Sequence, residues 1–180
     1  MEHPSTQHLR FAIDDASSVS ALLRVPTDAW AGYVFAHGAG AGLEHAFLAA
    51  CACGLAERGI ASLRYQFPYM EQGSKRPDAP KTAHAAVRAA VAETAQRLAG
   101  LPLFAGGKSF GGRMTSQAQA VQPLVHRLGE RATLALFDDA DHAFHVRARS
   151  GRTDAQTLGA LLDATASWMR VELEHVPAMR

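Results

Sequence analysis

The sequence has only two cysteines, few aromatic residues and no long hydrophobic run. Cys51 and Cys53 stand two positions apart in a predicted helix, so their side chains diverge and no disulfide forms between them. We expect both to be small buried side chains, since a metal or redox role would need further ligands. The longest apolar run, residues 46–56, is far shorter than the ~20 residues that span a membrane. The polar first ten residues lack a signal-peptide core, and a cytoplasmic location is expected.

A strong excess of either charge is also missing. Lysine and arginine number 18 against 17 acidic residues, which gives a net charge of +1. Nothing in this balance would attract nucleic acid or an anionic membrane, so we expect neither as a partner. With 48% hydrophobic residues in 180, the chain can bury one sizeable core. We predict one domain over residues 1–180.

Predicted strands alternate with predicted helices along the middle of the chain. Strands are expected at 8–14, 20–26, 30–36, 60–67, 101–107 and 132–139, and helices at 45–60, 81–100, 108–120, 122–132 and 153–174. Residues 68–80 are rich in proline and charge and are expected to form a loop. This order predicts an α/β fold with a mainly parallel sheet and helices on both faces. Ligands of such folds gather where the strands end.

Residues 104–113, FAGGKSFGGR, fit one of two glycine-rich motifs. A phosphate-binding P-loop needs glycine five positions before Gly107, where Pro102 stands, so only a degenerate match survives. The pattern G-x-S-x-G fits directly, with Ser109 at its centre. Its place between a buried strand and a helix is the context that a nucleophile elbow requires. The competing interpretation is a glycine-rich turn in which Ser109 caps the helix.

A serine nucleophile needs a base and donors for the oxyanion. His142 follows the last predicted strand and is the candidate base, although a surface or capping histidine would fit as well. The N–H groups of Phe110, next to the serine, and of Ala39, in HGAGAG, are the candidate oxyanion donors. We expect His37 to brace the HGAGAG loop.

The segment DDADHAFH, residues 138–145, allows a different interpretation. Its aspartates and histidines together suggest a metal cluster. One short acidic loop without a distant ligand motif is weak support for that, and we expect no metal or cofactor.

Four segments together carry a family resemblance: HGAGAG at 37–42, RYQFPYMEQGSKRPDAP at 64–80, GGKSFGGR at 106–113 and DADHAFHVRARSGRTDAQ at 139–156. They resemble the small α/β-hydrolases related to testis-expressed protein 30 and to the hydrolase-like domain of the third NSL-complex subunit, a group similar to dienelactone hydrolases. The resemblance covers residues 30–168. It implies an α/β-hydrolase fold with Ser109 as nucleophile, His142 as base, and Ala39 with Phe110 at the oxyanion.

The chain departs from that family between the serine helix and the histidine strand. Family members carry two more strands there, and the turn after the second supplies the acid of the triad. Here residues 121–132 read as one helix, so the fold is expected to be shortened by two strands. Asp138 or Asp139 would be the substitute acid. If the histidine strand does not pair beside the serine strand, an edge stays open, and a homodimer is then expected.

Basic residues surround the motifs, at 75, 76, 108, 113, 149 and 152. We predict that Arg113 and Arg152 bind an anionic acyl substrate, against the alternative of solvated surface charges. The sequence as a whole predicts a serine hydrolase of the esterase type for a small-molecule ester. The alternative is an inactive hydrolase-like module for protein–protein contacts, which the missing acid segment favours.

Overall fold

The computed structural model describes residues 5–118 and 151–175. The chain divides into two compact units, Met1–Arg127 and Leu128–Arg180. The first holds the sheet and its helices, and the second holds one long helix.

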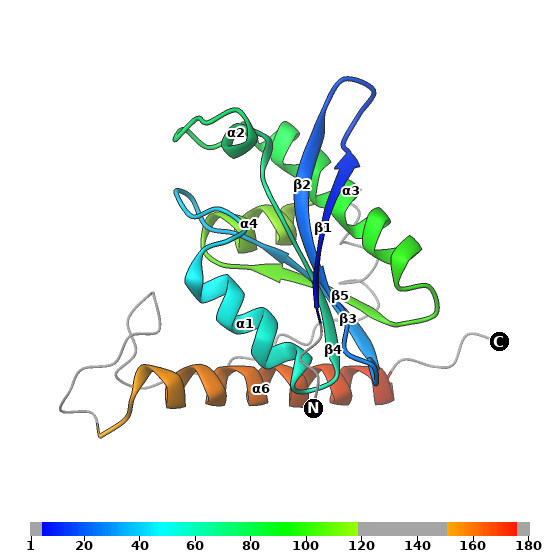
Figure 1. Ribbon diagram of the computed structural model, residues 1–180, viewed down its shortest axis with the longest axis vertical. Coiled ribbons are helices and arrows are strands. Elements are labelled where there is room, and N and C mark those ends of the chain that lie inside the picture. The colour runs from blue at the N-terminus through cyan, green and yellow to red at the C-terminus, as the bar shows by residue number, and fades with distance from the viewer. Residues whose placement is uncertain (1–4, 119–150, 176–180) are drawn as a thin grey trace. The chain divides into compact units, whose positions relative to one another are not determined.

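The first unit is built on a five-stranded mixed sheet in the order β1-β2-β4-β3-β5 (Figure 1). Its strands are β1 (Thr6–Ala12), β2 (Ser18–Arg24), β3 (Ala31–Ala36), β4 (Ile60–Tyr65) and β5 (Leu103–Gly107). The hairpin of β1 and β2 pairs antiparallel and adds to β4 in the same sense, whereas β4, β3 and β5 run parallel. The carboxyl ends of these three parallel strands therefore meet at one edge of the sheet.

Helices cover both faces of the parallel strands (Figure 1). In the first unit they are α1 (Ala46–Ala56), α2 (Pro68–Glu71), α3 (Pro80–Arg97) and α4 (Phe110–Gln117). The helix of the second unit is α6 (Asp154–His175). Side chains of α3 and α4, among them Val87 and Met114, share a core with Leu63 and Tyr65 of β4. The helix α1 contacts β4 on the other face.

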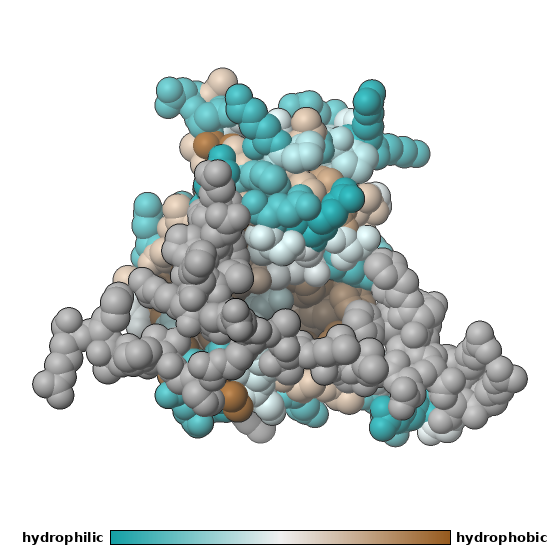
Figure 2. All heavy atoms as spheres, turned by 180° about the vertical axis from the view of Figure 1, so that it is seen from behind, coloured by the Kyte–Doolittle hydropathy of each residue, from teal (hydrophilic) through white to brown (hydrophobic). Residues whose placement is uncertain are grey.

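Helix starts follow local rules in both units. Pro80 occupies the first turn of α3, where its missing N–H costs nothing. Thr153 and Gln156 form a capping box at the start of α6: Gln156 N–H donates to the Thr153 hydroxyl, and Thr153 N–H donates to the Gln156 side chain. No described helix is both long and apolar enough to cross a membrane. The part of the surface formed by the β1–β2 hairpin, α2 and α3 is largely hydrophilic (Figure 2).

The predicted α/β fold, with parallel strands and helices on both faces of the sheet, is confirmed, and so are the strands and long helices predicted within residues 5–118 and 151–175. The predicted loop at 68–80 differs, because it contains the one-turn helix α2. The expectation that both cysteines are buried is wrong for Cys53, which is exposed while Cys51 is buried. Residues two apart on a helix point in nearly opposite directions, so one packs inward and the other faces solvent. The predicted helix at 122–132, the strand at 132–139 and the shortening between them lie outside the described residues.

Candidate active site

Ser109 stands at the turn between β5 and α4, with a backbone conformation that is rare for a serine. Its φ is 52° and its ψ is −113°, and it is the one non-glycine residue with positive φ in the part of the chain that the structure describes. Such a conformation costs a side-chain-bearing residue of order 1–3 kcal/mol and concentrates at functional sites. Ser109 occupies the N-cap position of α4, but its side chain makes no capping hydrogen bond and is exposed, so the structure does not support the interpretation that the serine side chain caps the helix.

Glycines on either side of Ser109 let this turn lie against the end of β3. A Cβ atom on Gly107 would lie 2.5 Å from the carbonyl oxygen of Ala36, and one on Gly111 would lie 2.6 Å from the same atom. Both obstacles are backbone atoms, which cannot rotate away. The Lys108 N–H also donates to the Ala36 carbonyl at 3.1 Å. Any side chain at the two glycine positions would therefore push the turn away from β3.

The HGAGAG loop follows β3 and is fixed by His37, which is fully buried. The His37 Nε2 atom accepts the Phe67 N–H at 3.0 Å, so Nδ1 carries the proton and donates to the Gly38 carbonyl at 2.8 Å. Burial lowers the pKa of His37 and keeps the ring neutral, as both bonds require. His37 thus ties the end of β3 to the end of β4, as predicted from the sequence.

The loop so fixed lies beside the serine. A Cβ atom on Gly38 would lie 3.8 Å from the Ser109 Cβ. Among the hydrogen bonds of residues 5–118 and 151–175, none uses the N–H of Ala39 or of Phe110 as donor. Two N–H groups without acceptors therefore flank the serine turn, one from each loop.

A cavity of about 490 Å³ opens at this point. Its lining residues come from the HGAGAG loop, the segment before α3, and the serine turn with α4: Ala39, Pro77, Asp78, Pro80, Ser109, Phe110, Arg113 and Met114. The structure thus brings together Ser109, Phe110, Ala39 and Arg113, which the sequence analysis singled out from separate segments.

The other predicted site residues are not in this group. His142, Asp138 and Asp139 lie outside the described residues. Arg152 is described in the second unit, where it is exposed next to the capping residue of α6. No group of three potential metal ligands occurs within residues 5–118 and 151–175.

Asp78 is the lining residue that the sequence analysis missed. It is half-buried in the connection between α2 and α3, and its Oδ2 atom accepts the Tyr69 N–H at 3.1 Å. Burial raises the pKa of Asp78, although the hydrogen bond from Tyr69 opposes the shift. The flanking prolines in PDAP, which restrict the backbone, were the available signal.

The basic residues near the motifs differ in where they point. Lys108 places its Nζ atom 4.4 Å from the centroid of the Phe47 ring, in α1. Arg113 keeps its guanidinium carbon 5.9 Å from the centroid of the Phe110 ring, which also lines the cavity. Among the residues that line the cavity, Arg113 carries the one positive charge.

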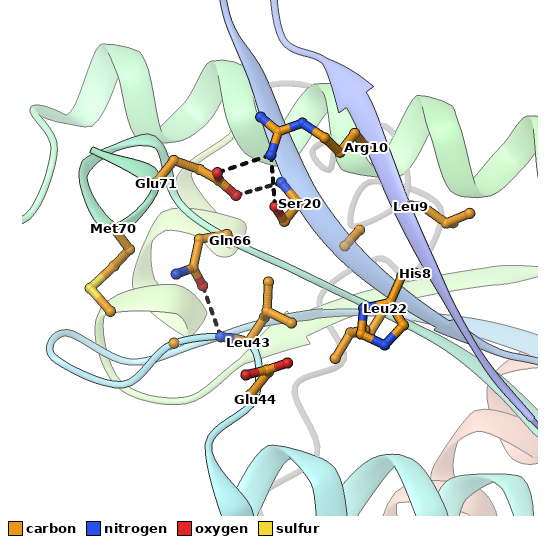
Figure 3. Close-up of a pocket in the computed structure, with 12 residues that line it drawn as sticks. His8, Leu9, Arg10, Ser20, Leu22, Leu43, Glu44, Gln66, Met70 and Glu71 are labelled. Atoms are coloured by element: carbon orange, nitrogen blue, oxygen red, sulfur yellow. Dashed lines mark hydrogen bonds and ion pairs between the residues drawn. The ribbon is translucent and has the colours of Figure 1, made fainter. Parts of the chain in front are cut away.

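A second hollow of about 550 Å³ lies over β1, β2 and the ends of β3 and β4, and none of the predicted site residues lines it (Figure 3). Several of its polar groups bind one another. The Glu71 carboxylate accepts the Ser20 N–H at 2.6 Å and pairs with Arg10 at 3.3 Å, and the Gln66 side chain accepts the Leu43 N–H at 2.9 Å. These bonds fasten α2 and the loop after β3 to the sheet and its flanking segments. The polar groups of this hollow that form them have a structural role.

The comparisons with known proteins agree with this geometry. Residues 30–126 match the model of the family described as alpha/beta hydrolase domain. No curated protein matches the chain.

Solved structures share the fold at low identity. A dienelactone hydrolase from Anabaena variabilis has 18% identity and a TM-score of 0.60 over 68% of this chain, which spans 60% of that protein's length. A lidless α/β serine hydrolase from Xanthomonas campestris has 16% identity and a TM-score of 0.67, over 98% of this chain and 97% of that protein. The ferulic-acid-bound Est1E from Butyrivibrio proteoclasticus has 19% identity and a TM-score of 0.53, over 84% and 70%. The family model covers more than half of the chain, which belongs to the α/β-hydrolase domain family.

Proposed function

We propose that the chain is a serine hydrolase of the esterase type, with Ser109 as nucleophile and a small-molecule ester as substrate. The observation that carries the proposal is the strained, exposed Ser109 at the mouth of a cavity of about 490 Å³. Holding a serine in this conformation costs free energy and is justified where the hydroxyl must be presented to a substrate. Within the family, the chain is proposed to stand near the small dienelactone-hydrolase-like proteins related to testis-expressed protein 30.

The proposed reaction is acyl transfer in two halves. The Ser109 Oγ attacks the acyl carbon while His142 takes the hydroxyl proton, and the carbonyl oxygen becomes an oxyanion. The N–H groups of Ala39 and Phe110 donate to this oxyanion. The bond to the alcohol then breaks, and the alcohol leaves with the proton from His142. Water attacks the acyl-enzyme in the same way and releases the acid.

Two further roles are proposed for charged residues. Asp138 or Asp139 would orient His142 in place of the acid that the family normally supplies. Arg113 and Arg152 would favour an anionic acyl group. If the double variant Arg113→Gln/Arg152→Gln keeps the ratio of kcat/KM between anionic and neutral esters, the arginines have no such role.

The test of the nucleophile is intact-mass spectrometry before and after a fluorophosphonate probe. Ser116 lies in α4, seven positions after Ser109, and is also exposed, so Ser116→Ala is a matched control for Ser109→Ala. We expect one adduct on the parent chain and on Ser116→Ala, and none on Ser109→Ala. The His142→Ala variant should label about 10³-fold more slowly, because the serine loses its base. An unlabelled parent chain would refute the proposal and favour a hydrolase-like binding module.

A further inference from the structure

Part of the wall of the cavity at Ser109 is formed by the segment at residues 77–80, which leads into α3. Pro77 and Pro80 restrict the backbone on both sides of Asp78, and all three line the cavity with Ser109. A carboxylate is thus held in the space where the acyl group of a substrate would lie.

The hydrogen bonds of Asp78 within the protein use only one of its two carboxylate oxygens. Oδ2 accepts the Tyr69 N–H, which anchors α2. Asp78 does not cap α3, because the capping position belongs to Ala79, without a side-chain bond. No hydrogen bond or ion pair of the described residues uses Oδ1.

Arg113 lines the same cavity but does not neutralise Asp78. None of the ion pairs among the described residues joins the two side chains. The Asp78 carboxylate is half-buried, and its Oδ1 atom, which has no donor among the described residues, is not one of the buried unpaired atoms and is therefore open to water. A ligand that supplies a donor would replace this water, whereas a methyl group in the same place would displace it without a new hydrogen bond.

We propose that Asp78 is a specificity-determining residue, which selects acyl groups that carry a hydrogen-bond donor, either a hydroxyl or an ammonium group. The inference rests on the proposed function, because it takes the cavity at Ser109 as the acyl site. Hydrogen bonds to a charged group are stronger than neutral ones, and an ammonium group would add charge attraction. The ammonium-bearing substrate is therefore expected to gain most from Asp78 itself; the proposed preference of Arg113 for anionic acyl groups acts against an ammonium group and is tested separately by the arginine variants.

The experiment compares p-nitrophenyl esters whose acyl chains differ only at the end. Matched sets end in methyl, hydroxyl or ammonium, in a short series (butanoyl, 3-hydroxypropanoyl, β-alanyl) and a long series (heptanoyl, 6-hydroxyhexanoyl, 6-aminohexanoyl). The variant is Asp78→Asn, which keeps a carbonyl oxygen for the Tyr69 N–H and removes the charge. The control is Asp28→Asn, the same change at an exposed position before β3, at the opposite edge of the sheet.

In Asp78→Asn we expect kcat/KM to fall about tenfold or more for an ammonium ester and about threefold for its hydroxyl counterpart. The methyl esters should change less than about twofold, and Asp28→Asn should change none of them. An equal loss for all three endings would mean that Asp78 only shapes the cavity. Unchanged donor-bearing esters would also overturn the inference.

Two readouts separate this inference from the proposed function. Fluorophosphonate labelling of Asp78→Asn should still give one adduct, at Ser109, since the nucleophile is untouched. Calorimetric binding of the corresponding amides, such as 6-aminohexanamide against heptanamide, needs no hydrolysis. If no ester is hydrolysed, the proposed function fails. The binding of the amides then tests whether Asp78 recognises a hydrogen-bond donor. Equal affinities of parent and Asp78→Asn for 6-aminohexanamide would overturn its role.

Discussion

The strained backbone of Ser109 can be tested through its preference between alanine and glycine. At most positions alanine is the more stable of the two, because glycine loses more backbone entropy on folding. At φ 52° and ψ −113° the order should reverse, since only glycine adopts this conformation without steric cost. We therefore expect Ser109→Gly to be more stable than Ser109→Ala, although both lack the hydroxyl.

The size of the effect follows from two opposing contributions. The strained conformation costs alanine about 1–3 kcal/mol, and the extra entropy of glycine costs about 0.5–1 kcal/mol. With mid-range values of about 2 and about 0.75 kcal/mol, the net preference for glycine at position 109 is about 1 kcal/mol. Ser116 provides the opposite case, because it lies in α4 and has ordinary helical φ. There alanine should be favoured by about 1 kcal/mol.

The assay is urea unfolding of the four variants, followed by fluorescence in a Trp168→Phe background so that Trp30 reports on the first unit. With m of about 1–3 kcal/mol/M, a difference of about 1 kcal/mol moves the midpoint by about 0.3–1 M. The midpoints should rank glycine above alanine at position 109 and alanine above glycine at position 116. The same ranking at both positions would refute the strained backbone, and with it the structural basis of the elbow.

Three further predictions concern the framework of the site. Gly111→Ala places a methyl group against the backbone of Ala36, so it should lower the free energy of unfolding by about 1–3 kcal/mol in the same urea assay. The control is Gly159→Ala, whose methyl group meets nothing within 4 Å and should raise the free energy of unfolding by about 0.5–1 kcal/mol. Burial lowers the pKa of His37 below its ordinary 6.5, so its contribution to stability is present above pH 6.5 and is lost as the pH falls further. Urea midpoints should therefore fall less between pH 7.5 and 5.5 in His37→Gln, and an identical fall would contradict the buried neutral ring. Burial alone would raise the pKa of Glu71, but hydrogen bonds from Ser20 and Arg10 lower it below 4.5. The stabilising contribution of Glu71 is therefore present above pH 4.5 and is lost as the pH falls through the lowered pKa. Glu71→Gln should thus flatten the dependence of the melting temperature on pH between pH 5 and 3.

The sequence predicted those parts of the site that depend on neighbouring residues. The elbow is encoded by glycines two positions from Ser109, and the strand and helix on either side are recognisable from their own composition. Ala39 was found because a buried apolar run breaks into glycines after β3. Parallel pairing of β3 and β5, with Ala36 opposite Gly107, then brings the two loops together.

The parts that could not be predicted depend on hydrogen bonds between side chains and backbone groups, which no sequence motif encodes. The helix α2 has one turn, which is too short to be stable by propensity alone. It is held by the Glu71 carboxylate on the Ser20 N–H, 51 residues away, and by Asp78 on the Tyr69 N–H. Neither pairing leaves a local pattern. The composition of residues 68–80 therefore indicated a loop, and Asp78 was not recognised as part of the cavity wall.

The position of Ser109 and the wall of the cavity at residues 77–80 are set by different kinds of contact. The position of Ser109 is set by backbone contacts between the elbow and β3, in which side-chain charges take no part. The wall at residues 77–80 is set by hydrogen bonds that side-chain carboxylates accept from backbone N–H groups, and an amide of the same shape can also accept them. Substitutions in residues 68–80 should therefore change which esters are accepted and leave the fluorophosphonate reactivity of Ser109 unchanged. Substitutions of Gly107 or Gly111 should instead reduce the reactivity of Ser109 toward every probe. A wall variant that lost labelling without losing stability would show that the two are coupled.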